Sequence, residues 1–178
     1  YVALNQRSVT HHLEHKLDPN TWQLDMRAVD GAVASHVADQ LNDTTVPTPS
    51  TFVLSIGGND ALQYLDEIAN LNLMDFYRIK ESFRDEYAQA LKLIAEYNQP
   101  LIVCTIYNPK LPDPQVQKMA EAGLSFFNDV ITEEALKLKL PIIDLRDVCS
   151  GEEAFANPIE PSEIGGDLIT NEIISHLL

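Results

Sequence analysis

The sequence has few of the features that mark secreted or membrane-spanning proteins. It contains two cysteines, Cys104 and Cys149, which are too few for a disulfide framework and do not form a CxxC pair. No apolar run approaches the length of a membrane span, and the first residues lack the basic and then apolar pattern of a secretion signal. We therefore expect a protein of a reducing compartment, the cytoplasm.

Basic residues are scarce as well. The chain has 12 lysine and arginine residues against 27 aspartate and glutamate residues, which gives a formal net charge of -15 at pH 7. Such a charge would repel a nucleic-acid backbone and an anionic membrane surface, so we expect neither of them as the main partner. A small molecule that is neutral or cationic fits this surface better.

The apolar content and its distribution predict the fold class. A chain of 178 residues with 45% hydrophobic residues can bury one core, which predicts a single domain over residues 1–178. Short apolar runs rich in branched residues alternate with longer stretches of helical period, a pattern typical of an α/β protein with a parallel sheet. The expected strands are 22–29, 51–56, 101–107 and 141–145, and the expected helices are 2–17, 33–41, 75–97, 113–139 and a closing helix after residue 161.

Glycine-containing turns follow two of the expected strands. Gly31 follows the first strand, and Gly57 and Gly58 follow the second in the sequence SIGGND. Ligands of open parallel sheets bind at the carboxyl ends of the strands, where glycine lets a backbone N–H approach them closely. With the side-chain amide of Asn59, these turns have the parts of an oxyanion hole. The alternative is that Asn59 and Asp60 only cap a helix.

Six short motifs along the chain carry a resemblance to a known family. In order they are AVDGAV, LSIGGNDAL, CTIYNP, FND, IIDLRDVC and NPIEPSEIGG. Their order and spacing resemble the SGNH hydrolases, also called GDSL-type esterases and lipases. The resemblance implies a three-layer α/β/α sandwich with a flavodoxin-like parallel sheet, and ester hydrolysis through a serine acyl-enzyme without a cofactor. It also implies that the backbone N–H of Gly31 and the side chain of Asn59 hold the oxyanion.

The chain departs from the family pattern in two places. In the family, the nucleophilic serine belongs to a glycine-aspartate-serine motif that follows the family's own first strand, a strand that precedes the counterpart of residues 22–29. No such motif occurs in residues 1–178. We expect this strand and its serine upstream of Tyr1; without the strand the sheet would have a gap at its middle. In the last block, Asn157 stands where the family has aspartate, and Glu160 stands where it has histidine. Glu160 is the candidate base if burial raises its pKa, and otherwise a loop or cap residue.

Three further residues are candidate substrate contacts. Gly58 lies in the turn that approaches the ligand, Tyr107 leaves the strand 101–107, and Asn157 lies in the last block. Tyr107 could line the pocket for the acyl group, or it could be part of the pocket wall without contacting the substrate.

The stretch HHLEH at residues 11–15 contains the spacing H-x-x-E-H, which is known from zinc sites. His11 and His15 would share one face of a helix. The core stripe of this helix runs through Val9, Leu13 and Leu17, which places the two histidines toward solvent. No third ligand is evident, so we predict a surface histidine pair and no metal.

Together these features predict an ester hydrolase that acts on a small acyl substrate. Two other classes stay open. One is an inactive relative that binds a small molecule without hydrolysing it, and the other, with less support, is a metal hydrolase built on residues 11–15.

Overall fold

A parallel sheet of three strands forms the centre of the molecule. The computed structural model describes residues 5–41, 45–65 and 70–177. In this part of the chain the strands lie in the order β1-β2-β3, with β1 at Phe52–Leu54, β2 at Leu101–Cys104 and β3 at Ile142–Ile143. Because the strands are mostly branched and apolar, they are suited to a sheet that is covered on both faces.

Helices connect and cover the strands. The α-helices are α1 (Val9–Lys16), α2 (Val37–Leu41), α3 (Gly58–Leu62), α4 (Leu73–Ala95), α5 (Pro114–Lys137), α6 (Leu145–Val148) and α7 (Glu163–Leu177), and the short 3-10 helices are η1 (Ala34–His36) and η3 (Glu152–Ala154). The two longest begin at side-chain caps. Asn72 accepts hydrogen bonds from the first turn of α4, and Asp113 does the same for α5. None of the helices in the described ranges is long and apolar enough to cross a membrane.

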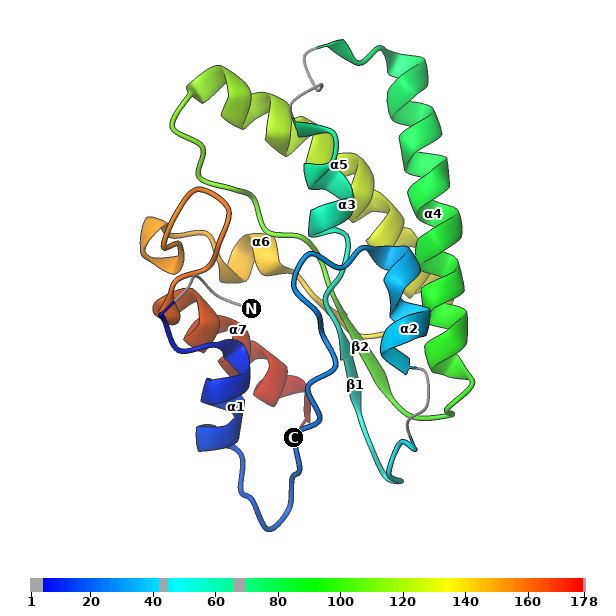
Figure 1. The fold of residues 1–178 in the computed structure, drawn as a ribbon, viewed down its shortest axis with the longest axis vertical. Helices are drawn as coiled ribbons and strands as arrows, with labels where there is room; N and C mark the ends of the chain where they lie inside the picture. Colours follow the sequence, from blue (N-terminus) through cyan, green and yellow to red (C-terminus); the bar gives the residue numbers. More distant parts are fainter. Residues whose placement is uncertain (1–4, 42–44, 66–69, 178) are drawn as a thin grey trace.

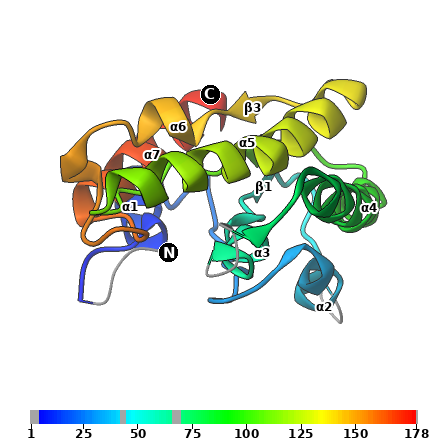
Figure 2. The same ribbon diagram turned by 90° about the horizontal axis from the view of Figure 1, so that it is seen from above.

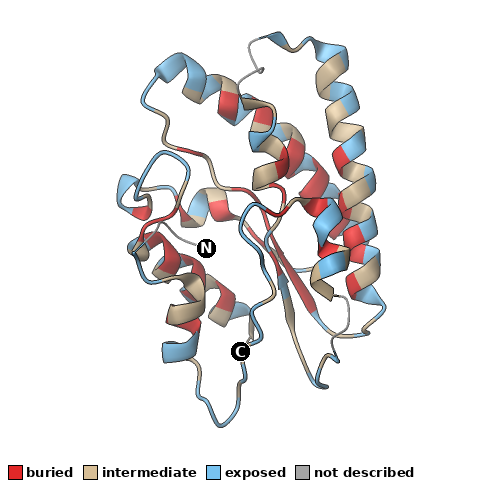
Figure 3. Ribbon diagram, viewed as in Figure 1, coloured by how far each residue is buried: buried red, intermediate tan, exposed pale blue. Residues whose placement is uncertain are grey.

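The helices form two layers, one on each face of the sheet (Figures 1 and 2). Because side chains alternate along a strand, Leu101 and Val103 of β2 pack in a core with α4 and α5. Ile102 and Cys104 pack on the opposite face in a second core with α1, α6 and α7. Figure 3 shows that burial concentrates in the sheet and on the inner sides of the helices. The predicted three-layer α/β/α sandwich is confirmed.

The first helix is shorter than predicted. Residues 5–8 are not helical, and α1 begins at Val9 because the Ser8 hydroxyl accepts the His11 N–H at 3.1 Å and caps it. The remainder of the predicted stretch, residues 2–4, lies outside the described residues.

The strand predicted at 22–29 is not formed. These residues are extended, and Trp22 and Leu24 are half-buried while Gln23 and Asp25 are exposed, so burial alternates over this first part of the segment. However, none of the described residues pairs with this segment in a ladder. A strand requires hydrogen-bonded neighbours, and alternation alone does not provide them.

One edge of β1 faces this segment without pairing to it. In Figure 1 the extended chain before α2 runs along the side of β1 that is opposite β2. Val53 of β1 is 38% exposed, and Ser55 just beyond the strand is also exposed. Within the described ranges, β1 has β2 as its one ladder partner. The backbone groups on its other edge are therefore available for pairing.

Candidate active site

The turn after β1 requires glycine at one position. Gly57 has a φ of 114°, a backbone conformation that L-amino acids rarely adopt. A Cβ on Gly57 would lie 3.0 Å from Cζ of Phe83 and 3.2 Å from Cδ1 of Ile106. The sharp turn leads directly into α3, which begins at Gly58. As a result, Asn59 lies in the first turn of this short helix, at the carboxyl end of the strand.

The side chain of Asn59 reaches the turn that contains Gly31. Its Nδ2 donates a hydrogen bond of 3.0 Å to the carbonyl oxygen of Ala32. Gly31 has a φ of 75° and is exposed, and none of the hydrogen bonds among the described residues uses its N–H. The amide of Asn59 has two N–H groups, and the bond to Ala32 uses one of them. The structure therefore brings together Gly31 and Asn59, two residues that the sequence assigned to one site.

Asp60 has a larger role in the structure than the capping role considered from the sequence. It is 7% exposed, and its two carboxylate oxygens lie 3.1 and 3.2 Å from the Ala34 nitrogen, whose N–H they accept. Burial raises the pKa of this carboxyl group. Ala34 lies 26 residues earlier in the chain. No local pattern indicates a contact over this distance, and the sequence analysis missed it.

The last block forms a compact turn around Asn157 and Glu160. Oδ1 of Asn157 accepts the N–H groups of Ile159 and Glu160 at 3.1 and 2.9 Å, and its Nδ2 donates to the Glu160 carboxylate. The Tyr107 hydroxyl donates to the Ile159 carbonyl at 3.0 Å, so the tyrosine holds this turn to the end of the segment that follows β2. Burial raises the pKa of Tyr107, and the nearby Glu160 charge adds to the shift. Three residues assigned from the sequence, Tyr107, Asn157 and Glu160, thus form one cluster.

This cluster borders an open cavity of about 540 Å³. Its wall includes Lys110, Leu111, Gln117, Phe155 and Asn157, so apolar and polar groups both line it. The Lys110 ammonium lies over the Phe155 ring at 5.6 Å and donates to the Ser150 carbonyl. In the described part of the chain, no hydrogen bond links this cluster to Gly31 or Asn59.

Asn128, from the FND motif, is a structural residue at the end of β2. It is 2% exposed, and its side chain binds both backbone groups of Ile106: it accepts the N–H at 2.7 Å and donates to the carbonyl at 2.9 Å. These bonds satisfy the backbone where the chain leaves the sheet, just beyond the Thr105 N–H, which still donates to the Ile143 carbonyl of β3 at 3.0 Å. The motif therefore contributes to the shape of this edge of the sheet, close to Gly57.

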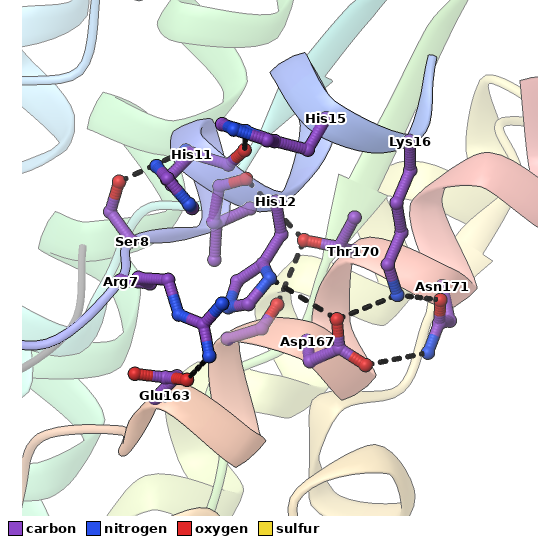
Figure 4. A network of polar contacts seen from close by, with 12 residues as sticks. Arg7, Ser8, His11, His12, His15, Lys16, Glu163, Asp167, Thr170 and Asn171 are labelled. Carbon is purple, nitrogen blue, oxygen red and sulfur yellow. Dashed lines mark hydrogen bonds and ion pairs between the residues drawn. The ribbon is translucent and has the colours of Figure 1, made fainter.

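The histidines of α1 lie in a polar network that joins α1 to α7 (Figure 4). The His11 and His15 rings are 4.0 Å apart on the outer side, and Nδ1 of His15 lies 2.7 Å from the His11 carbonyl oxygen. His12, which the sequence analysis did not single out, is buried, and its Nδ1 lies 3.2 Å from Asp167 of α7. Lys16 also pairs with Asp167, at 2.6 Å. Residues 5–41, 45–65 and 70–177 contain no group of three or more potential ligands arranged to hold a metal.

Comparisons with known proteins identify the fold. No protein-family model matches the chain, and no curated protein matches it. Solved structures do match. The lipase Lip_vut3 from a goat rumen metagenome superposes with a TM-score of 0.75 at 18% identity, over 98% of this chain and 89% of that chain.

Two other solved structures agree with this match. A member of the lipolytic protein G-D-S-L family from Veillonella parvula has a TM-score of 0.70 at 15% identity, over 98% of this chain and 90% of that chain. The acetyl xylan esterase AlAXEase has a TM-score of 0.67 at 14% identity, over 96% and 88%. The chain therefore has an SGNH hydrolase-like fold, as its motifs predicted.

Proposed function

We propose that this protein hydrolyses carboxylic esters of a small acyl substrate through a serine acyl-enzyme. The observation that carries the proposal is the 3.0 Å hydrogen bond between Asn59 Nδ2 and the Ala32 carbonyl. This bond joins Asn59 to the residue that follows Gly31, which supports a site in which the second N–H of Asn59 and the Gly31 N–H, unused by the bonds among the described residues, act together. Solved structures with this fold include lipases and an acetyl xylan esterase, which supports the same class of reaction.

In the proposed reaction, the serine Oγ attacks the ester carbonyl carbon and gives its proton to a base. The carbonyl oxygen becomes an oxyanion and accepts hydrogen bonds from the Gly31 N–H and from Asn59 Nδ2. When the tetrahedral intermediate collapses, the bond to the alcohol oxygen breaks, and the alcohol leaves with the proton from the base. Water then hydrolyses the acyl-enzyme by the same sequence of steps. No step requires a cofactor.

Glu160 is the proposed base. It is half-buried, and one of its carboxylate oxygens is held by Asn157 Nδ2, which leaves the other oxygen able to accept a proton. We expect Glu160→Gln to reduce the acylation rate by about 100-fold or more with little change in KM, because glutamine keeps the shape and lacks the proton acceptor. Glu163→Gln is the matched control, since Glu163 pairs with Arg7 at the start of α7. Equal acylation rates in the two variants would make Glu160 a structural residue.

The nucleophile is proposed to lie on a further strand that pairs with the open edge of β1. Support comes from the exposed Val53 and Ser55 and from the lack of a ladder partner on this edge among the described residues. The protein encoded by the whole reading frame should be labelled with a fluorophosphonate and digested, and the labelled peptide identified by mass spectrometry. We expect the label on a serine outside residues 1–178. A label on any serine within this range would refute the assignment.

The same protein tests the function itself. We expect it to hydrolyse p-nitrophenyl acetate and to lose this activity when it is labelled by the fluorophosphonate. The alternative function is an inactive relative that binds an ester without cleaving it, and the presence of Asn157 and Glu160 in place of aspartate and histidine favours it. Absence of both turnover and labelling, with calorimetric binding of an ester analogue, would establish that alternative.

A further inference from the structure

Asp60 is a buried carboxylate to which the proposed reaction gives no chemical step. A charged carboxylate is costly to bury unless it has partners that compensate for the loss of water. Here the partner is the N–H of Ala34, which both oxygens accept. Two nearby ionisable groups also act on Asp60: His36 of η1 favours the charged form, and Glu86 of α4 disfavours it.

Asn59 and Asp60 bind the same short segment at two points. Asn59 donates to the carbonyl of Ala32, and Asp60 accepts the N–H of Ala34. Ala32 and Ala34 are buried. The bond to Ala34 is buried and the bond to Ala32 is part-buried, and together they hold the segment against the first turn of α3. Gly31 is the residue directly before this segment, and its N–H is the second proposed donor to the oxyanion.

We propose that Asp60 is a positioning residue, which holds the Gly31 N–H at a fixed place relative to the amide of Asn59. This inference rests on the proposed function, because it concerns the two oxyanion donors. Asp60 does not contact the substrate in this proposal. It acts through Ala34. By this contact it fixes the Gly31 N–H relative to the Asn59 amide before the reaction begins, so that neither donor has to move as the oxyanion forms.

The competing explanation is that Asp60 only caps η1. The first N–H groups of a helix lack partners within it, and a carboxylate at this end is favourable. A cap of this kind would stabilise the fold, but it would leave the turnover of each folded molecule unchanged. The two explanations therefore differ in kcat per active site.

The kinetic test uses the protein encoded by the whole reading frame, with active sites counted by complete reaction with the fluorophosphonate. We expect Asp60→Ala to lower kcat per titrated site by about 10-fold to 100-fold, with KM changed by less than about 3-fold, because a small misplacement of catalytic groups can cost about 100-fold. Asp60→Asn keeps one acceptor oxygen for Ala34 and should recover most of this loss. If Asp60→Ala lowers the number of active sites but not kcat per site, the positioning role is refuted.

A matched control is Asn72→Ala. The Asn72 side chain also accepts N–H groups in the first turn of a helix, from Met74 at 2.8 Å and from Asp75 at 3.1 Å, but in α4. Its loss should lower the unfolding midpoint and leave kcat per site unchanged. In an Asn59→Ala background, Asp60→Ala should have a clearly smaller effect on kcat, since one of the two positioned donors is already absent. Fully multiplicative effects would refute the proposal.

A measurement independent of activity separates this inference from the proposed function. We expect slow hydrogen exchange at the Ala34 amide in the wild-type protein and in Asp60→Asn, and exchange at least about 10-fold faster in Asp60→Ala. If the protein hydrolyses no ester but shows this pattern, the function fails and the anchor at Ala34 stands. Equal exchange rates in the wild type and Asp60→Ala would refute the anchor, whatever the activity.

Discussion

Replacing Gly57 by alanine tests whether the turn that presents Asn59 depends on glycine. The φ of 114° at Gly57 is unfavourable for alanine, and a strained backbone of this kind costs about 1–3 kcal/mol. The added Cβ would also approach Phe83 and Ile106 to 3.0 and 3.2 Å, and overpacking of this kind costs about 1–3 kcal/mol more. We expect the free energy of unfolding to fall by about 2–6 kcal/mol, a large share of the roughly 5–15 kcal/mol of a typical domain.

Gly31→Ala is the matched control for this prediction. Gly31 also has a positive φ, 75°, but a Cβ there would meet no atom within 4 Å. This variant should lose the backbone term alone, about 1–2 kcal/mol. Both variants can be measured by urea unfolding followed by circular dichroism, with stabilities compared at equal m-values. If Gly57→Ala is no more destabilising than Gly31→Ala, then contacts with Phe83 and Ile106 do not exclude a side chain from this turn.

Three further predictions concern single groups. Asn59→Ala should lower ester turnover by about 100-fold to 1000-fold through loss of an oxyanion donor, and wild-type turnover in a folded variant would remove this assignment. The Tyr87 hydroxyl is buried without a hydrogen-bond partner in the described structure, so Tyr87→Phe should stabilise the fold. Each kcal/mol gained in the free energy of unfolding should raise the unfolding midpoint by about 2–4 °C, and a lower midpoint would show that the hydroxyl has a partner. Burial and Glu86 raise the pKa of Asp60, the Ala34 N–H and His36 lower it, and the net shift is upward. Asp60 therefore adds to the free energy of unfolding in full at pH values below its pKa in the unfolded chain, and this contribution is lost as pH rises through its pKa in the folded protein. The free energy of unfolding of the wild type relative to Asp60→Asn should therefore fall as pH rises through this range. Because a protonated Asp60 keeps one acceptor oxygen for the Ala34 N–H, as asparagine does, kcat per site should follow the same pH profile in both proteins; an acid limb that is absent only in Asp60→Asn would show that positioning requires the charge of Asp60.

The long elements of the fold could be predicted because each carries its own signal. Helices α4 and α5 lie within two residues of the predicted 75–97 and 113–139, since a helical period sustained over many residues determines which face is buried. The strands are shorter than predicted, because a strand ends where its neighbour stops pairing. Thus the apolar run 101–107 forms β2 only over Leu101–Cys104, with a last backbone bond from the Thr105 N–H to the Ile143 carbonyl, and the run 22–29 forms no ladder with the described residues.

In the candidate site, too, contacts within one stretch of chain could be predicted, whereas contacts between distant stretches could not. The position of Asn59 follows from two adjacent glycines after an apolar run, which is local information. The contact between Asn157 and Glu160 also lies within one turn of chain. The contact of Asp60 with Ala34 depends on how two loops meet, and the sequence near Asp60 is equally compatible with a simple helix cap.

The two parts of the candidate site are held in different ways, and this difference bears on what each part can tolerate. Asn59 is held in a turn that packs against Phe83 and Ile106 of the core, so a change there alters both the fold and the chemistry. Glu160 lies in a mostly exposed turn whose bonds are chiefly to its own neighbours, with Tyr107 below. Oxyanion donors must be fixed in place before charge develops, whereas a proton acceptor requires mainly a suitable pKa and reach. An exposed turn can exchange one acceptor for another without repacking the core, which is why a glutamate at this position is compatible with the fold.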